Sequence, residues 1–165
     1  MRSLYGTVSR STETTLSRCE MKVKIKKLDS RAVLPTYGTE YSAGADLYAL
    51  LDEKIDIIPG QTTLVHTGLS VEIPEGYCGL IFARSGLASK RGLAPANKVG
   101  VIDADYRGEV MVALHNHSTE IQSIDSGERI AQFAIVPFLK AEFELSNELS
   151  DTLRGDGGFG STGRK

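Results

Sequence analysis

The sequence contains no tryptophan, only two cysteines and no marked excess of either charge. Lys and Arg total 19 against 21 Asp and Glu, a formal net charge of −2, so the chain lacks the overall basic field typical of proteins that bind duplex nucleic acid. No apolar run approaches the ~18–20 residues that a membrane-spanning helix needs. We therefore expect neither nucleic acid nor a membrane as a partner.

The two cysteines, Cys19 and Cys78, form no CxxC pair and no cluster with histidine. The three histidines (His66, His115 and His117) show no metal-ligand spacing and are expected to be solvated or hydrogen-bonded. Neither a zinc site nor a disulfide is therefore expected. Cysteine usage of this kind is typical of a reducing, intracellular compartment, and we expect a cytoplasmic protein.

A length of 165 residues, 41% of them hydrophobic and 24% charged, is that of one globular domain. Residues 1–20 are rich in Ser, Thr and Arg and show no apolar periodicity, so we expect a disordered N-terminal extension. They lack the apolar segment of a secretory signal. A transit peptide, which would direct the protein to an organelle, is an alternative that Glu13 and Glu20 weaken, and Met21 is a possible start codon.

From residue 21 onward, short β-type runs alternate with turns that contain Pro or Gly. We expect strands at residues 22–28, 45–51, 54–58, 64–73, 77–83, 129–136 and 140–145. Residues 84–97 interrupt the pattern around one helical turn. Many short strands without an amphipathic helix predict an all-β sandwich, barrel or jelly roll.

Residues 100–110, GVIDADYRGEV, lie between two apolar runs and read as a β-hairpin. A hairpin turn requires Asn, Asp or Gly for its dihedral angles and little else. This segment carries three carboxylates, an aromatic ring and an arginine, which is more chemistry than a turn needs. Its carboxylates are therefore candidates for a functional site as well as for turn structure.

Four further segments contain candidate functional residues: AGADLYA (43–49), ARSGLA (83–88), GERIAQ (127–132) and the C-terminal RGDGGFGSTG (154–163). Each has a simple structural reading, such as a turn cap for Asp46 or a salt bridge for Arg84. Glycines with hydroxyls and arginine can also wrap a phosphate, although the C-terminal segment is not a Walker A loop. An aromatic residue such as Phe159 is not needed in a flexible tail, whereas it suits a lid that closes over a base or sugar.

Together and in chain order, the five segments resemble motifs 1 to 5 of the homotrimeric dUTP pyrophosphatase (dUTPase) family: AGADLYA, ARSGLA, GVIDADYRGEV, GERIAQ and RGDGGFGSTG. The resemblance covers residue 21 to the C-terminus. It implies a β jelly roll over residues 21–145, active sites shared between the subunits of a homotrimer, and an arm of residues 146–165 that closes over a neighbour's site. Residues 141–154 could span on the order of 40 Å when extended, which permits such an exchange.

The resemblance also implies the reaction, hydrolysis of dUTP to dUMP and pyrophosphate, which limits uracil in DNA and supplies dUMP for thymidylate synthesis. Asp103 matches the general base that activates water for attack on the α-phosphorus, whereas Asp105 and Glu109 are expected to serve turn and trimer structure. Mg²⁺ is the implied cofactor, held by the triphosphate and water with no direct protein ligand, and Asp46 would reach it through water. The implied substrate-binding residues are Arg84, Ser85, Gly86, Asn97, Gly100, Val101, Ile102, Asp103, Tyr106, Met111, Gln132, Arg154, Phe159, Gly160 and Ser161.

Substrate choice is assigned by the resemblance to the segment around Asp103. The backbone of residues 100–103 and of Met111 would pair with the edge of uracil, Asn97 would supply a side-chain amide, and Tyr106 would pack under the deoxyribose. Two alternatives remain open: a dCTP deaminase of the same fold, and a dUTPase-fold regulatory module that binds a protein. Ammonia released from dCTP would indicate the first.

Overall fold

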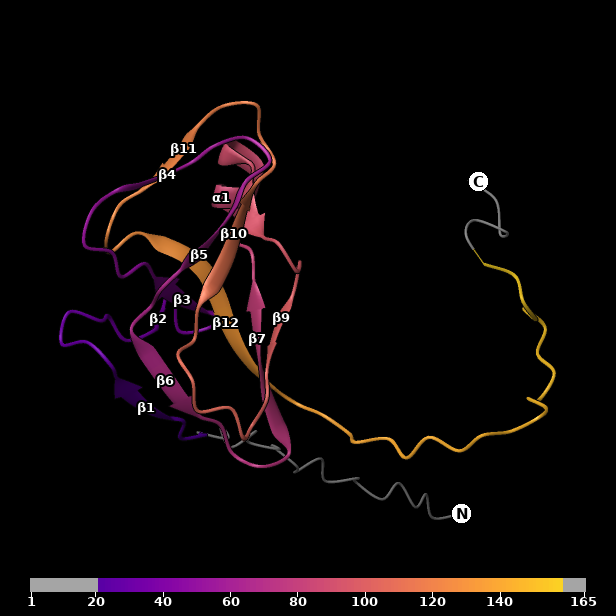
Figure 1. Cartoon of the computed structure of the whole chain (residues 1–165). Helices are drawn as coiled ribbons and strands as arrows, with labels where there is room; N and C mark the ends of the chain where they lie inside the picture. Colours follow the sequence, from indigo (N-terminus) through magenta and orange to yellow (C-terminus); the bar gives the residue numbers. More distant parts are fainter. Residues whose placement is uncertain (1–20, 159–165) are drawn as a thin grey trace, which may run out of the picture.

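The structure, a computed structural model, describes residues 21–158, which form an all-β body followed by an exposed arm (Figure 1). Every ladder between its strands is antiparallel. The largest sheet has five strands in the order β2 (Thr36–Tyr37), β3 (Ala45–Tyr48), β12 (Arg129–Pro137), β7 (Tyr77–Phe82) and β9 (Gly100–Ile102). The predicted all-β fold is confirmed.

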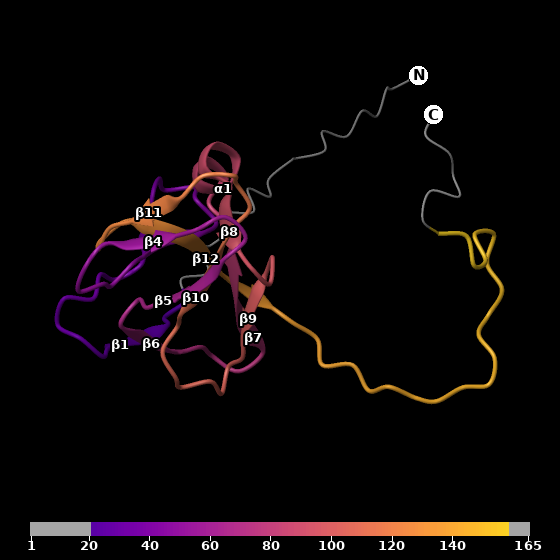
Figure 2. The same ribbon diagram turned by 45° about the horizontal axis from the view of Figure 1, so that its top comes forward.

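Three smaller sheets complete the body. One contains β5 (Thr62–Val65), β10 (Val112–Asn116) and β8 (Leu93–Pro95) in that order. The other two pair β1 (Lys24–Lys27) with β6 (Leu69–Glu72), and β4 (Ile55–Ile57) with β11 (Gln122–Ile124). As Figure 2 shows from a second direction, the sheets wrap around a common interior rather than forming a flat layer.

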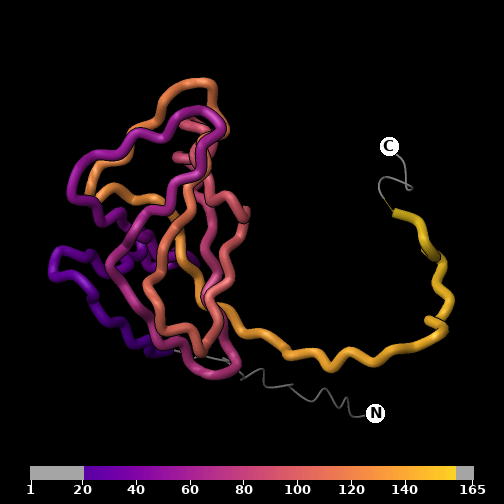
Figure 3. Tube along the Cα trace, in the orientation of Figure 1, coloured from indigo at the N-terminus to yellow at the C-terminus, as the bar shows by residue number. Residues whose placement is uncertain are grey.

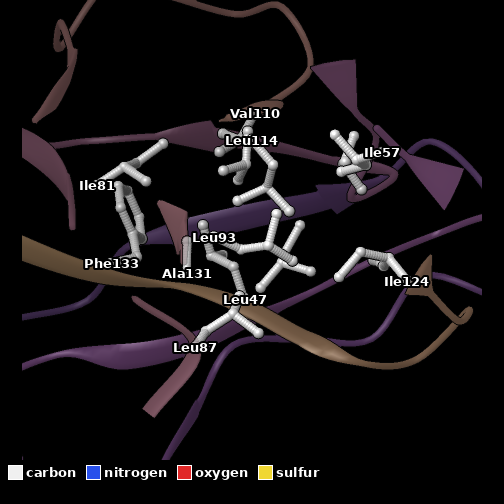
Figure 4. Close-up of a cluster of buried hydrophobic side chains, with 14 of the residues drawn as sticks. Leu47, Ile57, Ile81, Leu87, Leu93, Val110, Leu114, Ile124, Ala131 and Phe133 are labelled. Carbon is white, nitrogen blue, oxygen red and sulfur yellow. The ribbon is translucent and has the colours of Figure 1, made fainter. Parts of the chain in front are cut away.

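The core lies between the buried faces of these sheets. Along β10, burial alternates so that Val112 and Leu114 point inward, as the period of a strand requires. They join Leu47, Ala131 and Phe133 of the large sheet in one apolar cluster (Figure 4). Both sheets therefore contribute to a single hydrophobic core, which fixes the relative positions of the strand ends that carry the candidate residues.

One helix, α1 (Ser85–Arg91), follows β7 directly and confirms the helical turn expected within residues 84–97. Arg84 precedes it in an extended conformation, and Gly92 ends it with φ of 66°, in the left-handed region that glycine tolerates. Leu87 anchors α1 in the core. Within residues 21–158, no helix is long and apolar enough to cross a membrane.

The predicted β-hairpin around residues 100–110 is wrong. Its first strand, β9, pairs with β7, whereas β10 pairs with β5 and β8. Residues 103–111, called here the 103–111 loop, therefore connect two different sheets. β9 hydrogen-bonds to β7, and β10 lies between β5 and β8, so each of the two strands has neighbours of its own and they do not pair with each other.

The strand predicted at residues 140–145 is also absent. The chain leaves the sheet at Pro137, the last residue of β12, and residues 139–153 are exposed and without regular structure. Figure 3 shows this segment running away from the body. An alternating sequence forms a strand only beside a partner strand, and none of the described strands lies beside this segment.

Candidate active site

The 103–111 loop and the end of β9 line a pocket of about 230 Å³. Its walls include Leu64, Glu109 and five of the substrate-binding residues that the resemblance implies; the five are Val101, Ile102, Asp103, Tyr106 and Met111. Asp103 is exposed and Tyr106 is 40% exposed. An exposed carboxylate, an aromatic ring and strand backbone therefore face one small cavity.

Tyr106 folds back over the loop that carries it. Its hydroxyl donates a hydrogen bond to the carbonyl oxygen of Glu109 at 3.0 Å. A Cβ atom added to Gly108 would collide with the Tyr106 hydroxyl oxygen and lie 2.5 Å from the adjacent ring carbon. Any side chain at residue 108 would displace the ring, so glycine is required there for Tyr106 to lie across the loop.

Asn97 lies at the entrance to β9, beside Gly100. The side-chain amide nitrogen of Asn97 is 3.3 Å from where a Cβ of Gly100 would stand. Gly100 is buried in the ladder with β7, opposite Ile81. The absence of a side chain at residue 100 therefore leaves room for the Asn97 amide next to the strand backbone.

A second cluster gathers around Asp46 on β3. Asp46 is 5% exposed, and its two carboxylate oxygens accept hydrogen bonds from Arg84 Nε at 2.9 Å and Arg129 Nη1 at 3.1 Å. Arg84 Nη1 also donates to the Arg129 carbonyl oxygen at 3.4 Å. Two arginines thus share one buried negative charge, which leaves a net positive charge at this end of the large sheet.

Gln132 completes the second cluster. On β12 it lies between Asp46 of β3 and Phe82 of β7 in the sheet register. A Cβ atom on Gly44 would come within 3.2 Å of Gln132 Cβ, so glycine permits this close approach. Ser85 and Gly86, at the start of α1, are exposed next to Arg84. Motifs 1, 2 and 4 therefore meet in space.

The two clusters lie apart on one chain. The antiparallel ladder pairs Ile102 of β9 with Gly79 of β7, so Asp103 lies level with Cys78. Arg84 follows Cys78 by six residues along the direction of β7. At ~3.3 Å per residue, about 20 Å separates them. In Figures 1 and 2, α1 and the 103–111 loop accordingly lie toward opposite ends of the body.

The described part of the C-terminal segment, residues 154–158, meets neither cluster. Arg154 is exposed, and its Nε donates to the Gly157 carbonyl oxygen at 2.8 Å within the arm. The other predicted arm residues, Phe159, Gly160 and Ser161, lie outside the described residues, as does the predicted N-terminal extension. Their roles stay predictions.

Sequence patterns alone miss three participants. Arg129 stands within GERIAQ, and its positive charge close to Gln132 is the one signal that points to it. Glu109 and His66 are not predicted to meet, yet Glu109 Oε2 lies 2.8 Å from His66 Nδ1. Nothing in the spacing of residues 66 and 109 indicates this contact, because it depends on the packing of two loops that are distant in sequence.

Burial opposes the ionisation of Glu109, but hydrogen bonds from His66, Gly68 and Thr67 outweigh it and hold the pKa of Glu109 below its usual value. Glu109 therefore keeps its negative charge at neutral pH. Across residues 21–158, no three His, Cys, Asp or Glu side chains gather as a set of metal ligands.

Comparison with known proteins agrees with this geometry. The dUTPase family model matches residues 30–163. A deoxyuridine 5'-triphosphate nucleotidohydrolase of Acinetobacter baumannii is 49% identical over 150 residues, which cover 88% of this chain and all of that protein. One from Desulfitobacterium hafniense is 48% identical and covers 90% of this chain and 99% of that protein.

Solved structures are similar as well. The dUTPase of Staphylococcus bacteriophage 80alpha, solved with dUPNHPP, is 30% identical with a TM-score of 0.75, over 86% of this chain and 98% of that chain. A mutant dUTPase from phage phi11 of S. aureus, described with a structural Mg(II) ion, is 27% identical with a TM-score of 0.68, over 78% and 98%. From its motifs, its fold and these relatives, the chain belongs to the dUTPase family, whose members hydrolyse dUTP.

Proposed function

We propose that Asp103 is the general base with which this chain hydrolyses dUTP to dUMP and pyrophosphate. The observation that carries the proposal is the pocket that holds Asp103, Tyr106 and Met111 beside the end of β9. Its volume suits a nucleoside, and the exposed Asp103 carboxylate lies next to strand backbone that can hydrogen-bond to a base. Membership of the family supports the same substrate.

The chemistry requires a proton acceptor and a path for the leaving group. Asp103 takes a proton from water as the water oxygen forms a bond to the α-phosphorus. The bond from that phosphorus to the bridging oxygen breaks, and pyrophosphate leaves. General-base catalysis contributes about 10²–10⁴-fold, and positioning of the phosphates supplies further acceleration.

Arg84, with Ser85 and Gly86, binds the phosphates in this proposal, and Gln132 supports them. Arg84 uses its Nε on Asp46 and one hydrogen of Nη1 on the Arg129 carbonyl oxygen. Nη2 and the second hydrogen of Nη1 are left to bind phosphate oxygens. Arg129, 50% exposed at its side chain, adds a second positive charge. Arg154, Phe159, Gly160 and Ser161 cover the triphosphate and the base from the arm.

The residues present fit Mg²⁺ carried by the substrate. Each Asp46 oxygen accepts one arginine hydrogen bond and keeps a second lone pair for water. Asp46 can therefore orient a water of the ion's shell, while the triphosphate oxygens supply the direct ligands. When bound, Mg²⁺ neutralises charge on the phosphates.

Base selection follows from the backbone of residues 100–103 and Met111. Strand backbone offers donors and acceptors in a fixed pattern, with the Asn97 amide beside it. A pattern matched to uracil leaves a donor of cytosine facing a donor, and unpaired buried polar groups discriminate strongly. A close backbone wall also excludes the methyl group of thymine, and Tyr106 under the deoxyribose excludes a 2′-hydroxyl.

The separation of the clusters supports sites that are shared between the subunits of the proposed homotrimer. Asp103 must act on the phosphorus next to the phosphates that Arg84 binds, yet about 20 Å divides these residues within one chain. We therefore assign the two halves of each site to different subunits. The exposed segment that begins at Leu139 leads into the arm, which closes over a neighbour's site in this arrangement.

The predicted boundary between the catalytic domain (residues 21–145) and the arm (residues 146–165) stays a prediction, and the chain already leaves the large sheet after Pro137. The cytoplasmic location predicted above stays a prediction. Incubation of the protein with Mg²⁺ and either dUTP or dCTP tests the function. Pyrophosphate and dUMP from dUTP alone are expected, whereas ammonia from dCTP without dUTP hydrolysis would contradict the proposal.

A further inference from the structure

The 103–111 loop is attached to the connection between β5 and β6 and to the start of β6 by hydrogen bonds that involve its backbone. Thr67 Oγ1 donates to the Val110 carbonyl oxygen at 2.5 Å, and Ser70 Oγ donates to the Arg107 carbonyl oxygen at 2.7 Å. The Val110 amide donates to the Leu69 carbonyl oxygen at 2.7 Å. The second half of the loop is therefore held against a neighbouring connection, although it has no strand of its own.

The Glu109 carboxylate is the side-chain component of this attachment. Oε1 accepts hydrogen bonds from the amides of Gly68 at 2.7 Å and Thr67 at 3.2 Å, while Oε2 meets His66 Nδ1 at 2.8 Å. The side chain of Glu109 is 19% exposed. Ionised acceptors form stronger hydrogen bonds than neutral ones, so Glu109 is the firmest link between the two connections.

The local sequence shapes the acceptor site for this carboxylate. Gly68 has φ of 68°, in the left-handed region, and a Cβ there would lie 2.5 Å from a methyl carbon of Leu50. Glycine allows both the turn and the packing. The turn directs two successive amides toward Glu109, much as backbone nests bind anions.

Glu109 connects this attachment to Tyr106. Its carboxylate is fixed by residues 66–68, and its carbonyl oxygen accepts the Tyr106 hydroxyl at 3.0 Å. Gly108, between them, leaves room for the ring to lie over the backbone. Glu109 and Tyr106 also line the same pocket. The orientation of the Tyr106 ring thus depends on where Glu109 is held.

We propose that Glu109 is a positioning residue for sugar discrimination: its carboxylate, bound by residues 66–68, fixes the Tyr106 ring that excludes ribonucleotides. This inference rests on the proposed function of Tyr106. Loss of the carboxylate frees the loop to shift, and a ring that shifts admits the 2′-hydroxyl of UTP. A shift of the Tyr106 ring changes the selectivity for dUTP over UTP. Asp103 and the cluster around Asp46 and Arg84 act on both nucleotides alike.

Glu109→Ala tests the proposal through kcat/KM for dUTP and UTP with Mg²⁺. The ratio of the two values should fall by about tenfold. Glu109→Gln should recover most of the ratio, because its amide oxygen still accepts from Gly68 and Thr67. His66→Ala, at a side chain 55% exposed, should lower the ratio by about twofold. This variant tests the proposal if Glu109→Ala does not fold.

Glu128→Ala is the matched control. Glu128 is also a partly buried carboxylate that accepts from a backbone amide and a basic side chain, those of Asp125 and Arg91. Its loss should destabilise the fold without changing the ratio.

Tyr106→Ala separates the two possible failures. An unchanged ratio in Tyr106→Ala would overturn the role of Tyr106, and this inference with it. A lower ratio in Tyr106→Ala but wild-type ratios in Glu109→Ala and His66→Ala would overturn the inference alone.

Discussion

The candidate site has two proposed halves, a phosphate half around Asp46 and Arg84 and a base half around Asp103 and Tyr106. The two are built in opposite ways. The phosphate half is set into the large sheet, where one buried aspartate holds two arginines. The base half is a loop between sheets, held from outside by hydrogen bonds to residues 66–70. Phosphates are common to all nucleotides and need fixed charge, whereas a base and a sugar are recognised by shape. Changes in the first half should therefore weaken the binding of every nucleotide. Changes in the second half, other than at the proposed general base Asp103, should alter which nucleotide is accepted.

The largest effect is expected at Asp103, in the base half. Asp103→Asn keeps the shape of the pocket but removes the proton acceptor, so turnover of dUTP should fall by about 10²-fold or more. Single-turnover kinetics and the affinity for a non-hydrolysable dUTP analogue measure the two effects separately. Near-normal turnover would remove Asp103 as the base.

The second-largest effect on activity is expected from removal of the arm, whose described part contacts neither half of the site on its own chain. Truncation before Arg154 should reduce kcat/KM for dUTP by at least about tenfold, because the triphosphate loses its cover. Sedimentation should show an intact trimer. A monomeric product would mean that the arm assembles the subunits rather than closing the site.

A moderate effect is expected at Asp46, in the phosphate half. Asp46→Asn removes the charge that orients Arg84 and Arg129, so KM should rise by about tenfold for dUTP. The dUTP/UTP ratio should stay at its wild-type value, unlike that of Glu109→Ala. Asp56→Asn, at an exposed carboxylate that accepts from Ser123 Oγ at 2.6 Å, is the matched control. A changed ratio in Asp46→Asn would break the division between the halves.

The smallest effect is in the pH dependence of stability at Glu109. Its pKa is lower in the folded protein than its usual value, so the ionised carboxylate stabilises the fold above the unfolded pKa. That contribution is lost as the pH falls through the folded pKa. Denaturant midpoints of the wild type and Glu109→Gln should therefore differ at pH 7 and converge in acid. A difference that grows as the pH falls would contradict the assigned charge.

The sequence predicted local features well where short-range rules apply. The alternation along β10 and the apolar run of β7 reflect burial on known faces, and the break at Arg84 marks the start of α1. The grouping of Val101, Asp103 and Tyr106 in one pocket also follows from their closeness in the chain.

Features that depend on distant packing were not predictable. The hairpin was wrong because β9 and β10 find their partners in β7 and in β5 and β8. The contact of Glu109 with His66 joins connections 43 residues apart, and no periodicity encodes it. The strand at residues 140–145 was wrong because no strand within residues 21–158 lies beside this segment to pair with it.

Complementation tests the division of the site between subunits most directly. Asp103→Asn and Arg84→Ala chains are each expected to be inactive alone, and are unfolded together in equal amounts and refolded. If the base half and the phosphate half come from different subunits, about one quarter of the sites receive two intact halves, and activity returns to about one quarter of the wild-type level. Activity that stays at the level of the separate variants, in mixed trimers verified by mass, would place both halves on one chain and contradict the account.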